Sequence, residues 1–268
     1  MKMIISVFSS IVIIVLILFF VLFHIQHRLI FFPQKLDPDF RFSFKSFFEE
    51  RYFNTEDNVR IHALHFKVKN SKGIIYYMHG NAGSLQGWGE VSSDFLVHQY
   101  DILIIDYRGY GKSNGKISEK SLFKDAQVIY NTLKREYEEK DIVIYGRSIG
   151  SGIATYVASH NNPGLLILES PFYNLPDVAR TYFPWFPAKL IRFKFRNDIY
   201  IKDVKCPVYI FHGAMDEVID VKGSYKLKPK LKSGDRLIII DGGHHNDLMV
   251  FNEYQEQLGK ILSSFSER

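Results

Sequence analysis

The sequence has few of the residues that would indicate a disulfide-rich, cysteine-ligated or glycosylated protein. Cys206 is the single cysteine among 268 residues, which excludes an internal disulfide framework and a metal cluster held by cysteines. The chain contains no Asn-x-Ser/Thr sequon, no internal repeat and no low-complexity linker. Its net charge is +5, but the basic residues are scattered and no aromatic-basic motif accompanies them. We therefore expect no nucleic-acid partner.

Charged side chains are also missing from the start of the chain. Residues 3–23 form an uninterrupted stretch of 21 residues without a charge, which as a helix would cover about 30 Å and span a bilayer. The stretch has no polar face, which argues against a buried core helix. We predict a single-pass anchor over residues 1–28. A cleaved signal peptide is the alternative, although no Ala-x-Ala-like site follows, and basic residues on both flanks leave the side of the membrane open.

The remaining residues, 29–268, suit one α/β domain. Apolar runs of strand length recur along it, and their continuous character indicates strands that are buried on both faces. A helical pattern follows Ser118, between two of these runs, and a final amphipathic helix is predicted at residues 249–265, after the last run. This order predicts a mostly parallel sheet with helices on both faces, and an antiparallel edge strand at 58–68. The predicted parallel strands are 73–78, 101–105, 142–145, 164–168, 207–211 and 236–240.

Residues 171–206 interrupt this alternation. They are rich in aromatics and proline and show neither a strand pattern nor a strong amphipathic pattern. The segment follows a strand at the carboxyl edge of the predicted sheet, where open α/β sheets bind their ligands. We expect a small lid over the site, with a merely packed loop as the alternative.

A serine lies where a nucleophile would be expected. Gly146-x-Ser148-x-Gly150 stands between an apolar strand and a run of small residues that is compatible with a helix. A serine on such a tight strand-to-helix turn needs glycine at both flanking positions, because side chains there would collide with neighbouring backbone. Ser148 is the candidate nucleophile.

A serine hydroxyl needs a histidine base, and the histidine needs an acceptor that fixes its tautomer. Asp216 follows the strand at 207–211, with Glu217 and Asp220 as nearby alternatives. His244 and His245 both follow the strand at 236–240. Because carboxyl ends of parallel strands meet at one edge of the sheet, these groups are candidates for the same site as Ser148.

The oxyanion hole is expected to combine two backbone N–H groups. One belongs to Ile149, the residue after the candidate nucleophile, and the other to Asn81 in the loop after the strand at 73–78. Gly80 and Gly83 in this loop would let its backbone approach a substrate; the alternative is that they only shape a turn.

Taken together, these motifs resemble the α/β-hydrolase superfamily, and specifically its N-terminally membrane-anchored branch, similar to Bem-type and depalmitoylase-like hydrolases and to bacterial serine-aminopeptidase-like relatives. The order Ser148, Asp216, His245 is the order of the family's triad. In that branch the catalytic histidine precedes Asn-Asp, which favours His245 over His244. The sequence departs from the family's pattern at two positions. Relatives commonly carry a small residue in place of His244, and many have a proline in place of Asp220. The motifs are His-Gly-Asn-Ala-Gly at 79–83, Asp-Tyr-Arg-Gly-Tyr-Gly-Lys-Ser at 106–113, Gly-Arg-Ser-Ile-Gly-Ser-Gly at 146–152, His-Gly-x-x-Asp at 212–216 and His-Asn-Asp at 245–247.

The resemblance implies an α/β-hydrolase fold and acyl transfer to water without a metal or other cofactor. Ser148 would attack an ester or thioester carbonyl, His245 would carry the proton and Asp216 would orient it. The anchor and the aromatic lid suggest a small-molecule or lipid-like acyl substrate, but no substrate-binding residue is predicted. A peptidase or amidase with the same triad, and a non-catalytic membrane scaffold that kept the fold, are the alternatives.

Overall fold

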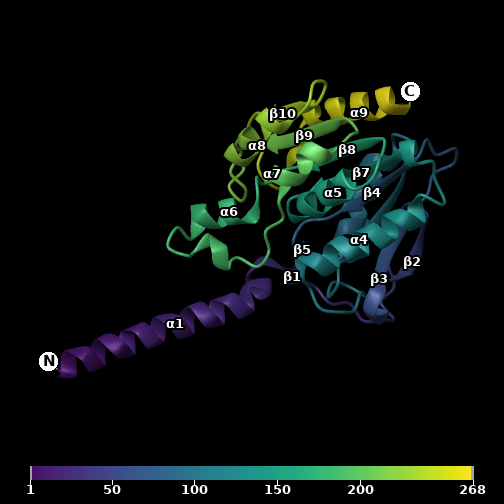
Figure 1. Ribbon diagram of the computed structural model, residues 1–268. Helices are drawn as coiled ribbons and strands as arrows, with labels where there is room; N and C mark the ends of the chain where they lie inside the picture. The colour runs from purple at the N-terminus through teal and green to yellow at the C-terminus, as the bar shows by residue number, and fades with distance from the viewer. Residues whose placement is uncertain (1, 267–268) are drawn as a thin grey trace.

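An eight-stranded sheet forms the centre of the molecule (Figure 1). The structure is a computed structural model and describes residues 2–266. The strands are β2 Phe48–Asn54, β3 Arg60–Phe66, β4 Ile74–Met78, β6 Asp101–Ile105, β7 Ile142–Arg147, β8 Leu165–Glu169, β9 Val208–Gly213 and β10 Arg236–Ile240. Their order across the sheet is β10-β9-β8-β7-β4-β6-β3-β2, and every neighbouring pair from β10 to β6 is parallel. The six predicted parallel strands are therefore confirmed.

The predicted edge strand is antiparallel but does not lie at the edge. β3 pairs with β6 on one side and with β2 on the other, so β2 forms that edge of the sheet. The connection between β2 and β3 turns through Asp57 and Asn58, whose φ angles are 67° and 56°. Asx residues tolerate this left-handed backbone better than most others. The prediction of an edge strand at 58–68 was wrong because β2 has too little continuous apolar character to stand out: it reads Phe-Glu-Glu-Arg-Tyr-Phe-Asn.

Helices cover both faces of the sheet, as expected. Successive side chains of β4 point to opposite sides, so Tyr76 belongs to one apolar core and Tyr77 to the other. The first core includes buried residues of α4 (Glu119–Leu133) and α5 (Ile149–Ser159), and the second includes residues of α3 (Ser92–Leu96) and α9 (Asn252–Ser266). Ser118 caps α4, its side chain accepting a hydrogen bond from the Ser121 amide.

Residues 171–206, called the cap segment below, contain more helix than their sequence predicts. They form α6 (Leu175–Tyr182), a 3-10 turn at Ala188–Leu190 and α7 (Asn197–Tyr200). α6 begins after Asn174, whose side chain accepts a hydrogen bond from the Asp177 amide, with proline inside the first turn. Two further short helices are α2 (Leu85–Trp88) and α8 (Lys222–Leu227).

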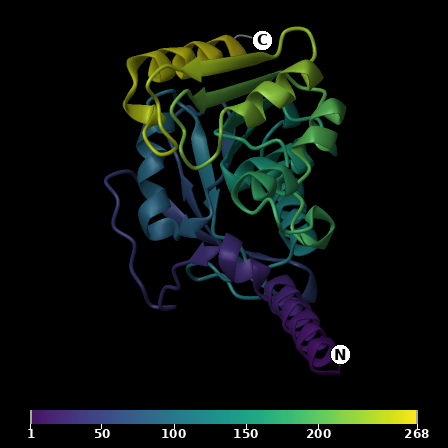
Figure 2. The same cartoon turned by 90° about the vertical axis from the view of Figure 1, so that its left-hand side faces the viewer.

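The N-terminal helix α1 (Lys2–Ile30) projects away from the domain (Figures 1 and 2). Within the described residues it is the one helix long and apolar enough to cross a membrane, with a mean hydropathy of 3.2 and an exposed surface. Its final turns contact the domain. Directly after it, β1 (Phe32–Pro33) pairs in parallel with β5 (Ala82–Gly83), the strand that follows the loop of Asn81.

Candidate active site

Ser148 sits on a strained turn between β7 and α5. Its φ is 52° and its ψ is −118°, a conformation that L-residues rarely adopt. The two flanking glycines are required by space: a Cβ on Gly146 would lie 2.4 Å from the Cβ of Ala154, and a Cβ on Gly150 would lie 2.1 Å from the carbonyl oxygen of Met78. The sequence therefore builds a turn that presents Ser148 at the carboxyl edge of the sheet.

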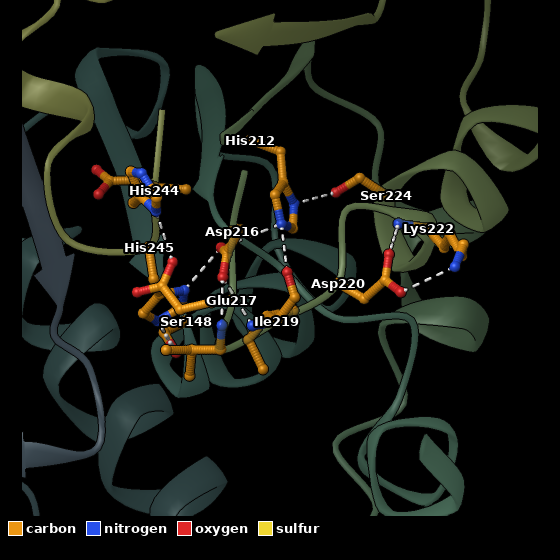
Figure 3. Close-up of polar contacts among 12 residues, drawn as sticks. Ser148, His212, Asp216, Glu217, Ile219, Asp220, Lys222, Ser224, His244 and His245 are labelled. Carbon is orange, nitrogen blue, oxygen red and sulfur yellow. Dashed lines mark hydrogen bonds and ion pairs between the residues drawn. The ribbon is translucent and has the colours of Figure 1, made fainter. Parts of the chain in front are cut away.

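Ser148, His245 and Asp216 form one chain of hydrogen bonds (Figure 3). His245 Nε2 lies 3.0 Å from Ser148 Oγ, and His245 Nδ1 lies 2.8 Å from Asp216 Oδ2. A carboxylate accepts the Nδ1 proton, which leaves Nε2 as an acceptor for the serine hydroxyl. All three residues are buried. The structure thus brings together the three residues that the sequence nominated from three separate strands.

Asp216 is held as a carboxylate. Its Oδ1 accepts hydrogen bonds from the backbone amides of Val218 at 2.9 Å and Ile219 at 2.7 Å. Burial by itself would raise the pKa of Asp216, but the hydrogen bonds from His212 and His245 outweigh burial and hold that pKa well below its usual range. The acceptor for His245 is therefore charged at neutral pH.

His212 is a supporting residue to which the sequence assigned no role. Its Nε2 lies 2.8 Å from the Ile219 carbonyl oxygen and 3.2 Å from Asp216 Oδ2, both acceptors, so this nitrogen carries the proton. Its Nδ1 then accepts from the Ser224 hydroxyl at 2.7 Å. The signal was present in the sequence, because His212 is the penultimate residue of β9 and stands four residues before Asp216.

The alternative residues point elsewhere. His244 Nδ1 lies 2.9 Å from Glu217 Oε2 in an exposed ion pair, and this hydrogen bond raises the pKa of His244. Asp220 accepts a hydrogen bond from the Lys222 amide at 2.8 Å and forms an ion pair with the Lys222 side chain at 3.3 Å. Figure 3 shows the separate directions of these side chains. Neither Glu217 nor Asp220 takes the place of Asp216 beside His245.

The two predicted oxyanion donors lie around the same space as Ser148. In the sheet Met78 pairs with Gly146, so the loop after β4 runs beside the turn that carries Ser148. Ile149 is the first residue of α5, where the backbone N–H has no acceptor inside the helix. The carbonyl of Asn81 is fixed by the Phe32 amide at 2.9 Å, and its side-chain amide donates to the Ile30 carbonyl at 2.9 Å. The loop of Asn81 is thus tied to the end of α1.

A cavity of about 570 Å³ opens next to Ser148. Its wall is mainly apolar, and apart from Asn81, Ser148 and Ile149 it comes from three parts of the chain: α1, the cap segment and the loop after Asp216. Its lining residues are Leu22, Gln26, Leu29, Ile30, Asn81, Ser148, Ile149, Phe172, Leu175, Val178, Ala179, Tyr182, Phe183, Trp185, Phe186, Ile191, Glu217, Val218 and Ile219. The contribution of α1 is not foreseen from the sequence. Over the described part of the chain, no group of three or more His, Cys, Asp or Glu side chains could hold a metal ion.

Comparison with known proteins agrees with this architecture. A family model described as "Serine aminopeptidase, S33" matches residues 69–199. The chain is 31% identical over 206 residues to alpha/beta hydrolase domain-containing protein 17B of Homo sapiens, covering 72% of this chain and 67% of that protein. It is 34% identical over 225 residues to the lysophosphatidylserine lipase ABHD12 of Macaca fascicularis, covering 74% and 56%.

Solved structures show the same fold. The esterase Pf2001 of Pyrococcus furiosus superposes with a TM-score of 0.69 at 21% sequence identity, over 88% of this chain and 98% of that one.

Proposed function

The chain belongs to the α/β-hydrolase superfamily, and from that premise we propose that it is a membrane-anchored serine hydrolase of carboxylic esters or thioesters with lipid-like acyl groups. The observation that carries the proposal is the hydrogen-bonded chain from Ser148 through His245 to Asp216. Its first member, Ser148, lines an apolar cavity. A scaffold protein would have no physical need for this arrangement on a strained turn.

In the proposed mechanism Ser148 Oγ attacks the substrate carbonyl while His245 Nε2 takes its proton. The N–H groups of Asn81 and Ile149 stabilise the oxyanion that forms, and collapse of the tetrahedral intermediate expels an alcohol or thiol that receives the proton from His245. Water, activated by His245, then hydrolyses the acyl-enzyme. Asp216 holds the Nδ1 proton of His245 and stabilises the imidazolium in both steps.

The lining of the cavity supports an acyl chain as the group that is bound. Lining residues next to Ser148 are mostly aliphatic and aromatic, which suits a hydrocarbon chain better than a peptide backbone. Among the lining residues that the structure describes, Glu217 is the single carboxylate, and it is paired with His244. A peptidase that recognises an α-ammonium group would need such a carboxylate to be free. We therefore favour ester or thioester cleavage over the amidase alternative.

For α1 we propose an uncleaved anchor. Its final turns line the cavity and their carbonyl and side-chain groups hydrogen-bond to the domain, contacts that a cleaved signal peptide would remove. The mass of the protein extracted from membranes tests this. A mature chain that begins near residue 30 would contradict it.

The function is tested on the full chain in detergent micelles. Labelling by a fluorophosphonate and hydrolysis of p-nitrophenyl esters, acyl-thioesters and peptide p-nitroanilides are compared for the wild type, Ser148→Ala and His245→Ala. We expect each substitution to lower ester turnover by about 10⁴-fold and Ser148→Ala to abolish labelling. His244→Ala is the matched control and should retain turnover, since the His244 ring is hydrogen-bonded to Glu217 and not to Ser148, His245 or Asp216. A wild-type chain that neither labels nor turns over any substrate would favour the scaffold alternative.

A further inference from the structure

The last turns of α1 form one wall of the cavity beside Ser148. Leu22, Gln26, Leu29 and Ile30 all line it. These positions are spaced by four, three and one residues, so they lie on a single face of the helix. A helix that served only as a tether would present no such face to the catalytic serine.

The cap segment is fastened to this face. Gln26 is buried; its side-chain amide donates to the Leu190 carbonyl at 2.8 Å, and its Oε1 accepts from the Arg192 amide at 2.8 Å. Phe23 lies one turn before Gln26 on α1, and the Arg192 guanidinium lies 5.4 Å from the centre of its ring. The cap segment and α1 are therefore joined to each other, and both contribute to the wall of the cavity.

The cap segment also contacts α1 within the charge-free stretch, on the N-terminal side of its last residue, Phe23. The rings of Trp185 and Phe186 lie 6.5 Å and 5.7 Å from the ring of Phe19. Phe19 precedes Phe23, the last residue of that stretch, by four residues, or about 6 Å along the helix axis. If α1 spans a bilayer, the tip of the cap segment at 183–186 lies among lipid acyl chains.

The surface of this tip suits such a location. Phe183 and Trp185 in the tip are 54% and 58% exposed, and Tyr182 directly before it is 51% exposed, next to the exposed apolar surface of α1. A cluster of exposed aromatic rings is unfavourable in water, whereas Trp and Tyr are enriched at the membrane interface. The same three residues line the cavity, so this side of the cavity lies at the same depth as the exposed rings.

We propose that the acyl substrate enters from the lipid bilayer, between α1 and the tip of the cap segment, and that Leu22 and Leu29 of α1 limit the length of acyl chain that the cavity accepts. The proposal rests on the proposed hydrolase function. It assigns the N-terminal helix a part in substrate binding as well as in anchoring. The ligand is a bilayer lipid with a hydrocarbon chain, which follows the apolar wall while its carbonyl reaches Ser148.

The first test measures chain-length selectivity with the full chain in phosphatidylcholine vesicles. For wild type, Leu22→Trp and Leu16→Trp, kcat/KM is determined for p-nitrophenyl palmitate and p-nitrophenyl acetate. The larger Leu22→Trp side chain fills part of the wall, so the palmitate-to-acetate ratio should fall about tenfold or more. Leu16 is 62% exposed and is not among the lining residues, so its variant should keep the wild-type ratio.

This design separates the two proposals. Fluorophosphonate labelling and acetate hydrolysis report on Ser148 and His245. A wild-type protein that shows neither labelling nor acetate hydrolysis would overturn the proposed function. Intact labelling with equal palmitate-to-acetate ratios in Leu22→Trp and wild type would overturn the role of α1 alone.

The second test measures depth in the bilayer. The chain has two tryptophans, so Trp88→Phe leaves Trp185 as the sole fluorophore and Trp185→Phe leaves Trp88. Both proteins are placed in vesicles of phosphatidylcholine brominated at the acyl carbons nearest the headgroup. We expect quenching of Trp185 to exceed that of Trp88 several-fold. Equal quenching of the two would overturn entry from the bilayer.

Discussion

Arg147 holds the backbone of His245, because its Nη2 donates a hydrogen bond to the His245 carbonyl oxygen across 3.1 Å. The same guanidinium pairs with buried Glu169 at 2.9 Å and stacks 5.1 Å from the ring centre of Trp88. Burial by itself would lower the pKa of Arg147, but the negative charge of Glu169 and the neighbouring tyrosines outweigh burial and raise that pKa. The residue before the candidate nucleophile thus fixes the loop that carries the candidate base.

Arg147→Ala should lower kcat for ester hydrolysis about 10²-fold with little change in KM, because His245 loses its fixed position relative to Ser148. The variant should also be less stable by about 3 kcal/mol, since the buried Glu169 carboxylate loses its ion pair and keeps only the hydroxyls of Tyr145 and Tyr254 as hydrogen-bond donors. Adding Glu169→Gln should recover most of the stability but not the activity. Recovery of both would mean that Arg147 acts only through stability. Kinetics and denaturant unfolding of the single and double variants measure this.

Asp216→Asn should reduce kcat by about 10⁴-fold, because an amide cannot enforce the His245 tautomer that leaves Nε2 free to accept the serine proton. The matched change Asp220→Asn alters a carboxylate on the same loop that contacts Lys222, and it should leave kcat within a factor of two or three. Steady-state ester hydrolysis compares them. Similar losses in both variants would show that the loop, rather than the Asp216 carboxylate, is needed.

Gly150→Ala should lower both stability and esterase activity, whereas Gly87→Ala should lower neither. A Cβ at position 150 would lie 2.1 Å from the Met78 carbonyl oxygen, so the backbone beneath the Asn81 loop must shift. Such overpacking costs about 1–3 kcal/mol or more and would also displace the oxyanion donors. A Cβ at Gly87, in α2, meets nothing within 4 Å and should be neutral or stabilising by up to about 1 kcal/mol. Thermal unfolding and esterase assays of both variants test the contrast.

His65 should make the protein less stable in mild acid. Burial and the neighbouring Arg51 lower the pKa of His65 from 6.5 to about 4. As the pH falls through 6.5 the unfolded chain gains a proton that the folded chain does not, so the free energy of unfolding decreases until about pH 4. At 1.36 kcal/mol for each unit, the loss attributable to His65 is about 3 kcal/mol at pH 4.

Replacing His65 with Gln, which does not titrate, should flatten the pH dependence of unfolding between pH 6.5 and 4. Denaturant titrations of wild type and variant at several pH values measure this difference. Parallel curves for the two proteins would contradict it.

The sequence predicts the sheet well because its central strands are buried on both faces and therefore read as continuous apolar runs. β2 was not predicted, for the opposite reason. It pairs with one neighbouring strand only, and charged residues such as Glu49 and Glu50 interrupt its apolar pattern. α6 was missed because its short, amphipathic stretch lies among prolines and aromatic residues.

Within the site, local motifs nominated the residues that the structure brings together, because each follows a recognisable strand. His212 and Arg147 were missed as supporting groups, since their roles depend on which loops face them in three dimensions. The wall formed by Leu22 and Leu29 was also missed, because nothing in an apolar segment marks which of its sides will meet the domain.

The junction between α1 and the domain has no flexible stalk. Ile30 ends the helix, and two residues later the Phe32 amide is already bonded to Asn81. A helix embedded in a bilayer would therefore carry the domain as a rigid extension and keep the cavity at a constant height. Encounters with substrate would then occur by lateral diffusion in two dimensions, and the rate would follow the mole fraction of the lipid in the membrane rather than its concentration in bulk water.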